Sequence, residues 1–443
     1  QDFSYVALDR ATDYAAADAR QTLALVPILQ QALKDHSQAM LYEKLELPLI
    51  NILCAMEQEG IVIDKEKLHD LNKEITVELE ELESTILKLV DKEPGSINLN
   101  SPKQLEELLF DILKLPVIKK TAQKTGRSTD YEVLKELSKL HGVPSLIIKY
   151  RELFKLKTTY IEALEKYRDP TTSKIHTTFS QTATATGRLS SSDPNLQNIP
   201  PSIRHAFKAS CGKLFISADY SQIELRVLAY LSQDSRLRQA FKEKQDIHAL
   251  TATGLFNVSL DHVSSAQREL AKRINFSILY GLTPYGLSKD LDIPFKQAKE
   301  YIERYLAQYP GVVAWMNSII EKAKAQGYIE TLWGRRRYVP GIYEKNRSLY
   351  ELARRIAINT VVQGTAAELV KLGMIKIFNG LKERVLDAKM ILQIHDEIVL
   401  QSASHHVLPV VDMVKDSLTN IVDWNVPMEV TIRTGASWGE VTK

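Results

Sequence analysis

Four side chains that could bind a nucleotide recur at four-residue intervals near the middle of the chain. They stand in the segment QRELAKRINFSILYG and are Arg268, Lys272, Phe276 and Tyr280. Residues four apart lie on the same face of a helix, so one face would present two cations followed by two aromatic rings. That order suits a nucleoside triphosphate, which has a polyanionic tail and a flat base. The alternative is a solvated basic edge beside two core aromatics, and the spacing by itself favours neither.

Two aspartates could bind divalent metal ions. Asp219 ends the apolar run KLFISADY, and Asp396 lies in KMILQIHDEIVLQS, which predicts a hairpin with His395, Asp396 and Glu397 at its tip. Phosphoryl transfer can use two magnesium ions about 3.5–4 Å apart, and such ions prefer oxygen ligands. An aspartate at a strand end more often only starts a turn. Either residue alone is better explained that way, but the pair together with the cationic helix favours a metal site.

The composition is that of an ordinary globular protein of about three domains. The chain has 443 residues, 44% of them hydrophobic and 25% charged, and its formal net charge is only +2. Nucleic-acid binding would therefore depend on local basic patches. The cysteines, Cys54 and Cys211, fit no metal or disulfide pattern and are typical of a reducing compartment. No apolar run approaches the ~20 residues that cross a membrane, and no signal peptide is recognisable, so we expect no membrane partner.

Helical periodicity dominates elsewhere. Residues 11–33 predict an early helix, and residues 68–89 have apolar positions every three or four residues, which predicts a long amphipathic helix. Residues 153–164 show the same pattern and could pack against it as an antiparallel hairpin. Thr129 is a candidate helix N-cap between them. Residues 234–354 are expected to be mainly helical.

A basic loop lies between the two long helices. The segment VIKKTAQKTGRSTD contains Lys119, Lys120, Lys124 and Arg127. Such a loop on a helical arm could hold phosphate backbones. More often a cluster of this kind is only a solvated surface.

Three of these segments together resemble a known family. DYSQIELRVLAYLSQD from Asp219, the helix with the cationic stripe and QIHDEIVL from Gln393 are similar to the three polymerase motifs of family A DNA polymerases, in the family's order. TATGRLSSSDPNLQNIP around Arg188 resembles the stretch before the first motif in bacterial members. SPKQL at Ser101 and TLWGRRRYVP at Thr331 extend the resemblance over nearly the whole chain.

The resemblance implies an α+β fold, a right-hand polymerase with an antiparallel-sheet palm, helical fingers and a helical thumb. The expected segments are the end of a 3′–5′ exonuclease domain at 1–37, the thumb at 38–170, the palm at 171–235 and 353–443, and the fingers at 236–352. Tyr14 and Asp18 match the last exonuclease motif. We expect no proofreading, because one carboxylate cannot hold two metal ions, and we expect this remnant to pack on the rest of the chain.

For the metal site, the resemblance implies that Asp219 and Asp396 bind two Mg²⁺ ions, which Mn²⁺ could replace. The backbone carbonyl of Tyr220 would be an added ligand, and Glu397 a supporting charge. Lys272 is implied to act in catalysis, as a compact charge against the negative charge that develops on the phosphate.

For the incoming deoxynucleotide, the resemblance implies that Arg268 and Lys272 hold the triphosphate, with help from His248. A guanidinium offers paired donors to phosphate. Phe276 would pack on the sugar and base; because it lacks a hydroxyl, nucleotides without a 3′-hydroxyl should be poor substrates. Tyr280 would stack near the templating base.

Glu224 matches the family's steric gate, which leaves no room for a 2′-hydroxyl. Without the motif it would be interpreted as an exposed helix glutamate. Hydrogen-bond acceptors in the minor groove recur in every Watson–Crick pair, so donors there can test pair geometry without reading sequence. The implied DNA-binding residues are Arg188, Arg355, Asn359, Gln363 and His395, with Lys119, Lys120, Lys124 and Arg127 from the basic loop.

Some residues depart from the family pattern. Ser277 stands where the family usually has glycine, and Pro284 stiffens the exit from the helix with the cationic stripe. We expect both to affect how the fingers close. The last residues, WGEVTK, lack the family's terminal histidine.

The expected function is template-directed addition of deoxynucleotides to a primer 3′ end in DNA repair or replication. The partners would be primer–template DNA and dNTPs, the chain would be a monomer, and the location would be the bacterial cytoplasm at the nucleoid. A non-catalytic clamp on primer–template DNA is the alternative, but it needs no metal-spaced carboxylates. A related RNA polymerase is disfavoured by Glu224.

Overall fold

The computed structural model describes residues 3–93, 95–121, 126–279 and 283–442. It divides into two compact units: unit 1 comprises residues 1–56, 179–190 and 217–432, and unit 2 comprises residues 57–178, 191–216 and 433–443. The expected division into thumb, palm and fingers is finer than these units and stays a prediction. Within the described residues, no helix is both long enough and apolar enough to span a membrane.

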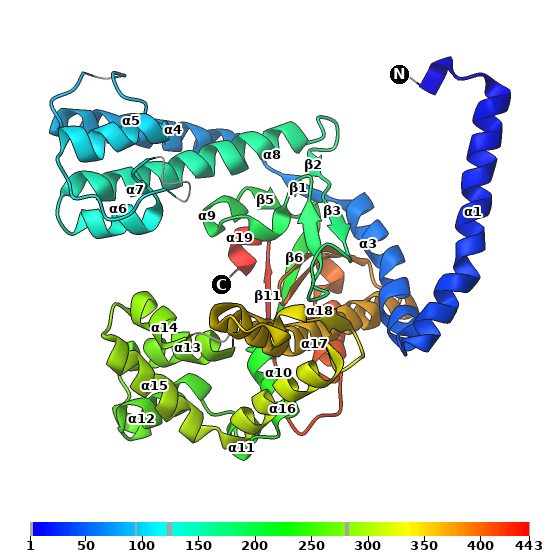
Figure 1. Cartoon of the computed structure of the whole chain (residues 1–443). Coiled ribbons are helices and arrows are strands. Elements are labelled where there is room, and N and C mark those ends of the chain that lie inside the picture. Colours follow the sequence, from blue (N-terminus) through cyan, green and yellow to red (C-terminus); the bar gives the residue numbers. More distant parts are fainter. Residues whose placement is uncertain (1–2, 94, 122–125, 280–282, 443) are drawn as a thin grey trace. The chain divides into compact units, whose positions relative to one another are not determined.

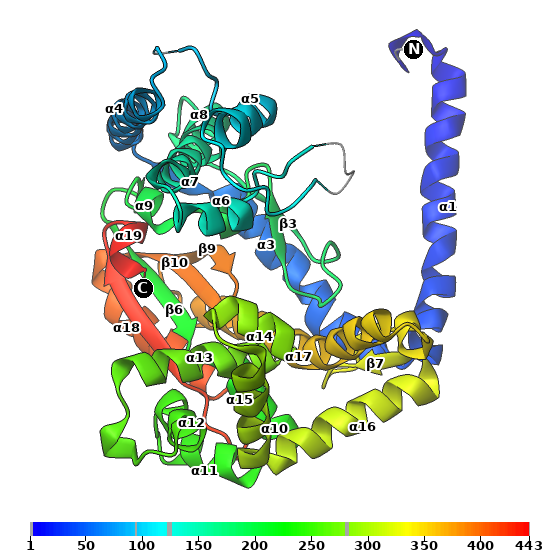
Figure 2. The same cartoon turned by 60° about the vertical axis from the view of Figure 1, so that its left-hand side comes forward.

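Unit 1 is built on a four-stranded sheet with the order β11-β6-β10-β9 (Figures 1 and 2). The strands are β6 (Lys213–Tyr220), β9 (Ala388–Ile394), β10 (Glu397–Ala403) and β11 (Val430–Gly435), of which the start of β6 and the end of β11 belong to unit 2.

The hairpin predicted around Asp396 is confirmed. β9 and β10 pair antiparallel with Glu397 opposite Ile394, which leaves His395 and Asp396 as the turn. His395 has φ +53°, the left-handed conformation that two-residue hairpin turns require. Nearly all residues of both strands are buried, because their apolar side chains face packed layers on both sides of the sheet.

Helices cover this sheet. The longest is α17 (Arg347–Glu383), which packs against α10 (Ile223–Ser232), α16 (Pro310–Gln326) and α18 (Val407–Thr419). At Gly373 of α17, an added Cβ would lie 2.5 Å from Cδ2 of Leu418 in α18. The two helices therefore approach more closely there than a larger residue would permit.

Most other elements of unit 1 are helical, as expected for residues 234–354. They are η1 (Phe3–Tyr5), α1 (Leu8–Asp35), α2 (Ala39–Leu41), η2 (Tyr42–Glu46), α3 (Leu47–Glu59), α11 (Ser235–Lys242), α12 (Ile247–Phe256), η6 (Leu260–His262), α13 (Ser265–Leu279), α14 (Pro284–Leu291), α15 (Phe295–Gln308), η7 (Pro340–Tyr343) and η8 (Ser404–His406). Two short strand pairs complete it, β7 (Tyr328–Glu330) with β8 (Arg336–Tyr338), and β3 (Thr178–Ser180) with β4 (Ser190–Ser192), of which residues 178 and 191–192 belong to unit 2. The α+β fold class is confirmed.

The early helix is present as α1, but the expectation that it packs on the rest is wrong. None of its residues, all of which the structure describes, is buried. Leu23 is 72% exposed, Ile28 63% and Tyr14 60%. The helix forms because alanine and leucine have high helix propensity, and that propensity says nothing about what the helix contacts.

Unit 2 contains the predicted antiparallel pair of long helices. The first is α4 (Lys65–Leu89), and the second is made of α7 (Gly142–Lys155), η4 (Leu156–Ile161) and α8 (Glu162–Tyr167). Lys157 Nζ donates to Thr76 Oγ1 at 2.8 Å, and Lys149 pairs with Glu78 at 2.5 Å. Contact positions rise along one helix as they fall along the other, which establishes the antiparallel direction.

Shorter elements close unit 2. They are β1 (Ile61–Ile63), α5 (Pro102–Glu107), η3 (Leu108–Ile112), α6 (Tyr131–Ser138), β2 (Lys174–Ile175), η5 (Leu196–Asn198), α9 (Pro201–Arg204), β5 (Phe207–Lys208) and α19 (Trp438–Val441), with the sheet order β2-β1-β5. The prediction of Thr129 as an N-cap is wrong. Asp130 caps α6 instead, because its carboxylate accepts the N–H of Val133 at 2.9 Å.

Candidate active site

The two aspartates lie on hydrogen-bonded segments of one sheet. Asp219 is the penultimate residue of β6, and the backbone N–H of the next residue, Tyr220, donates to the carbonyl of Asp396 at 3.2 Å. The Tyr220 hydroxyl is buried and donates to Leu418 O at 3.1 Å, which anchors this end of β6. Segments 177 residues apart in the chain therefore meet at one edge, as the sequence predicts.

Glu397 is oriented by the same sheet. Ser217 lies two residues before Asp219, on the same face of β6, and its hydroxyl donates to Glu397 Oε1. This hydrogen bond fixes the Glu397 carboxylate, and its role as a supporting charge stays a prediction.

Arg188 connects two of the expected site residues. Its Nη2 lies 2.5 Å from Glu224 Oε1 and 3.9 Å from Asp396 Oδ1. Glu224 stands in the first turn of α10 and its side chain is only 5% exposed. It is therefore not the exposed helix glutamate of the alternative interpretation. A buried carboxylate needs a partner, and Arg188 supplies it.

The helix with the cationic stripe is α13, and its expected capping box is confirmed. The N–H of Gln267 donates to Ser264 Oγ at 3.3 Å, and the N–H of Ser264 donates to Gln267 Oε1 at 2.9 Å. Arg268 and Lys272 are 41% and 46% exposed, so both can reach a ligand. Tyr280 lies outside the described residues.

Asp246, which was not predicted as a site residue, joins this helix to α12. Its Oδ1 caps α12 by accepting the N–H groups of His248 and Ala249, and its Oδ2 accepts from Arg268 Nε at 2.6 Å. An aspartate just before a helical run is a recognisable N-cap signal, but its second partner is visible only in the fold.

His248 is buried rather than open to solvent. Its side chain is 3% exposed, and its ring nitrogens lie 3.0 Å from Gln222 Nε2 and 2.9 Å from Asn275 Nδ2. The Phe276 ring is 5.8 Å away. Burial lowers the pKa of His248 to about 4. The imidazole is therefore neutral near pH 7 and can offer a hydrogen bond, but no positive charge.

Three expected DNA-binding residues form a row on α17. Arg355, Asn359 and Gln363 are four residues apart and half-buried. Asn359 Oδ1 is buried and has no hydrogen-bond partner among the described residues. A small pocket in unit 1 is lined by Arg188, Leu189, Ala367, Val370, Lys371, Gln393 and His395. It brings Arg188, the exposed His395 and α17 together.

The basic loop is in unit 2, and much of its charge is already neutralised. Arg127 pairs with Glu106 at 2.7 Å and with Asp111 at 2.5 Å, and Lys119 pairs with Asp130 at 2.8 Å. The hydrogen bond from Lys119, together with those from the Val133 N–H and the Ser128 hydroxyl, lowers the pKa of Asp130 to about 2. Lys120 is exposed, and Lys124 lies outside the described residues. Phosphate binding at this loop would require these cations to exchange partners.

The residues fit a divalent metal that substrate helps to hold. No group of three or more histidine, cysteine, aspartate or glutamate side chains in the described part of the chain could hold a metal ion. Magnesium is commonly bound by one or two carboxylates together with substrate phosphates and water. Asp219 and Asp396, with a backbone carbonyl beside them, are a donor set of that kind.

Four ionisable side chains that were not predicted to interact form a buried to half-buried cluster beside this site. Glu46, Arg335, Glu368 and Lys371 interact within unit 1, and Lys371 is 1% exposed. Glu368 Oε2 is buried and has no hydrogen-bond partner among the described residues. Burial raises the pKa of Glu368 from 4.5 to about 7.

This raised pKa predicts a pH-dependent stability. The folded chain binds the Glu368 proton more tightly than the unfolded chain, so the stabilisation is complete below pH 4.5 and is lost as the pH rises through 7. Relative to Glu368→Gln, which cannot titrate, the free energy of unfolding of the unmodified chain should fall by roughly 3 kcal/mol over this range. Urea unfolding at a series of pH values measures the difference. A difference that does not change with pH would contradict the expected pKa.

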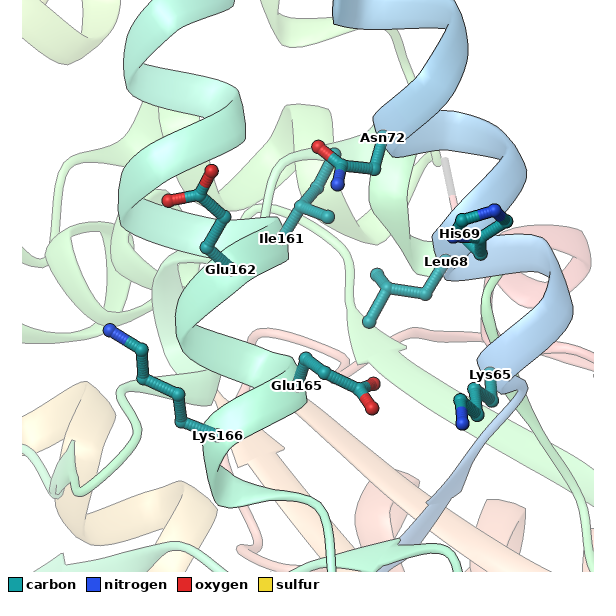
Figure 3. A pocket seen from close by; sticks show the side chains of 8 residues that line it. All are labelled: Lys65, Leu68, His69, Asn72, Ile161, Glu162, Glu165 and Lys166. Atoms are coloured by element: carbon teal, nitrogen blue, oxygen red, sulfur yellow. The ribbon is translucent and has the colours of Figure 1, made fainter.

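A larger pocket, of about 440 Å³, lies in unit 2 between the start of α4 and α8. Figure 3 shows Leu68 and Ile161 directed into the space between the two helices, with Lys65 and Glu165 at its edge. Charges of both signs line it, and none of the residues expected to act on a nucleotide is among them. We therefore place the candidate active site at the sheet edge of unit 1.

The chain is similar to a protein family and to individual proteins of that family. The family model described as DNA polymerase family A matches residues 65–440. The chain is 45% identical over 421 residues to a thermostable DNA polymerase I of Thermus thermophilus, covering 94% of this chain and 50% of that protein. It is 43% identical over 422 residues to DNA polymerase I of Geobacillus stearothermophilus, covering 94% and 48%. The chain thus spans about half the length of the curated relatives it matches.

A solved structure is similar as well. It is the POL domain of Pol1 from M. smegmatis in complex with DNA primer-template and dNTP, with 36% sequence identity and a TM-score of 0.88. The match covers 95% of this chain and 74% of that one.

Proposed function

The chain belongs to DNA polymerase family A, and from this premise we propose that it extends a primer 3′ end with deoxynucleotides, directed by a template strand, in DNA repair or replication. The reaction is nucleotidyl transfer: the primer 3′ oxygen attacks the α-phosphorus, and pyrophosphate leaves. The family suggests a divalent metal, and we propose two Mg²⁺ ions, which Mn²⁺ could replace.

Asp219 and Asp396 would hold the ions, with the carbonyl of Tyr220. When bound, the ions would stabilise the deprotonated primer 3′ oxygen and the negative charge on the leaving pyrophosphate. The chain's own contribution is rigidity. Both carboxylates stand at strand ends that are tied together by the Tyr220–Asp396 backbone hydrogen bond, so little reorganisation is needed when substrate arrives.

The triphosphate would lie along α13. Arg268 would exchange Asp246 for phosphate oxygens, Lys272 would oppose the charge on the leaving group, and neutral His248 would contribute at most one hydrogen bond. Phe276 would pack on the sugar, and Tyr280 would stack at the templating base. Closure of these helices over the nucleotide would exclude water.

Duplex DNA would be bound through its minor groove and its backbone. Arg188, Arg355, Asn359, Gln363 and His395 would present donors to base edges. Lys119, Lys120, Lys124 and Arg127 would contact phosphates. The remaining proposals are a monomeric state, a location in the bacterial cytoplasm at the nucleoid, and absence of proofreading by the residues of this chain.

The observation that carries the proposal is the meeting of Asp219 and Asp396 at one sheet edge. Primer extension with Mg²⁺ and all four dNTPs tests it. We expect template-dependent products, and none when EDTA is added. Binding of primer–template without any extension would instead support a non-catalytic clamp.

A further inference from the structure

The segment that carries Arg188 is a tight turn. Gly187 has φ +81°, and its N–H donates to Thr184 O at 3.3 Å. The Thr184 hydroxyl donates to the carbonyl of Arg188 at 2.6 Å. These bonds close the turn internally, but they do not fix where it sits in unit 1.

Arg335 supports this turn from one side. A Cβ atom added at Gly187 would lie 2.3 Å from Arg335 Nε and 2.7 Å from Cζ. The guanidinium therefore packs directly on the glycine backbone, with no room for another atom between them. Both the positive φ and this contact require glycine here.

Helix α17 and the β7–β8 connection support the turn from another side. A Cβ atom added at Gly364 would lie 3.1 Å from the carbonyl oxygen of Thr186 and 2.5 Å from Cγ2 of Thr331. The Thr331 hydroxyl donates to Glu368 at 2.8 Å and accepts the N–H of Arg335 at 3.0 Å. The turn thus contacts Arg335 through Gly187 and α17 through Thr186, and Thr331 links these two contacts.

Arg335 itself is held by carboxylates from two distant segments, η2 and α17. Its Nη2 pairs with Glu46 and its Nε lies 3.1 Å from Glu368, while Lys371 Nζ lies 2.7 Å from the same Glu46 oxygen. The side chains of Arg335 and Glu46 are 17% and 16% exposed, and that of Glu368 is fully buried. Screening by water is weak there, so the guanidinium has one strongly favoured position.

We propose that Arg335 is a positioning residue for Arg188. Through the Gly187 backbone, the buried charge cluster sets where the Arg188 guanidinium lies relative to Glu224 and Asp396. This inference rests on the proposed function. It adds that Arg188, one of the donors proposed for the minor groove of the duplex, is aligned by residues to which no DNA contact is assigned.

The first experiment does not depend on activity. Hydrogen exchange of the amides in residues 184–188 is measured at about pH 8, where Glu368 is ionised. In Arg335→Gln we expect the exchange rate of the Gly187 amide to rise about tenfold or more, which is the effect of losing one charge-assisted contact. Gly187→Ala disrupts the same contact, because its methyl group would overlap Arg335, and it should have the same effect.

Arg336→Gln is the matched control, because Arg336 pairs with Glu330 at 2.9 Å and packs on Tyr328 rather than on the turn. It removes the same charge from the next position of the chain. Exchange of residues 184–188 should stay as in the unmodified chain. Equal exchange in Arg335→Gln and the unmodified chain would overturn the proposal.

The second experiment tests the consequence for the reaction. Primers ending in guanine are compared with primers ending in 3-deazaguanine, which lacks the minor-groove acceptor N3. We expect the unmodified chain to extend the deaza primer about tenfold more slowly, and both Arg188→Ala and Arg335→Gln to lose this difference. A variant that was only unstable would extend both primers more slowly and would keep the ratio of the two extension rates.

The two experiments separate the possible failures. If the unmodified chain extends neither primer, the proposed function fails, and the exchange measurement alone judges Arg335. If the chain extends primers and Arg335→Gln keeps the full sensitivity to 3-deazaguanine, the positioning role is overturned. In a double variant of Arg188→Ala and Arg335→Gln, the ratio of extension rates on the two primers should be the same as in either single variant. Both substitutions act through one contact, so their effects on this ratio should not add.

Discussion

Replacing Asp396 with asparagine should reduce primer extension at least ~10³-fold, because the loss of several kcal/mol of charge stabilisation in the transition state corresponds to that factor. Asparagine keeps the shape of the side chain and removes its negative charge. The backbone carbonyl that accepts the Tyr220 N–H is unchanged, so the sheet edge should keep its geometry. Single-turnover extension with Mg²⁺ measures the effect, and fluorescence anisotropy should show primer–template affinity nearly unchanged.

Asp412→Asn is the matched control. Asp412 is exposed on α18, so the same chemical change there alters neither the sheet edge nor the charge beside Asp219. It should extend primers at the rate of the unmodified chain. Near-normal extension by Asp396→Asn would remove the assigned metal role, while a loss of both extension and DNA binding would point to misfolding instead.

Local patterns predicted much of the positioning framework. The hairpin at Asp396 follows from two apolar runs on either side of a polar turn, and the capping box of α13 follows from Ser264 and Gln267 three residues apart. Both depend on interactions between near neighbours in the chain. The Asp219–Asp396 meeting is not local, and it was predicted from their motifs rather than from periodicity.

The missed features depend on which distant charges share a low-dielectric interior. Nothing in the sequence distinguishes Arg335 from the next two arginines, yet it pairs with Glu46 and Glu368, whereas Arg336 pairs with Glu330 of its own hairpin. Lys371 looks like any helix lysine and is nearly inaccessible. Likewise, Arg127 looks like part of a free basic patch, but carboxylates from two earlier helices neutralise it. A single sequence does not record such pairings.

Replacing Glu224 with alanine should reduce the preference for deoxynucleotides over ribonucleotides by roughly 10²-fold, the scale on which a site can reject one added hydroxyl. The structure supports a steric role, because the Glu224 side chain is buried in the first turn of α10 and held by Arg188. Its position is therefore fixed before the sugar arrives. The ratio of kcat/KM for one dNTP to that for the matching rNTP, on one primer–template, measures the preference.

Glu224→Gln separates size from charge. Glutamine keeps the length of the side chain and can still accept a hydrogen bond from Arg188, so most of the preference should remain. Alanine also releases Arg188, which lies 3.9 Å from Asp396 and could then pair with it more closely. That new pairing would slow the incorporation of both nucleotides alike. The ratio of the two kcat/KM values, rather than either value alone, therefore identifies the steric gate. If the ratio is the same in the alanine variant and the unmodified chain, Glu224 is only a structural partner of Arg188. A loss of preference in the glutamine variant as large as in the alanine variant would instead assign discrimination to the ion pair.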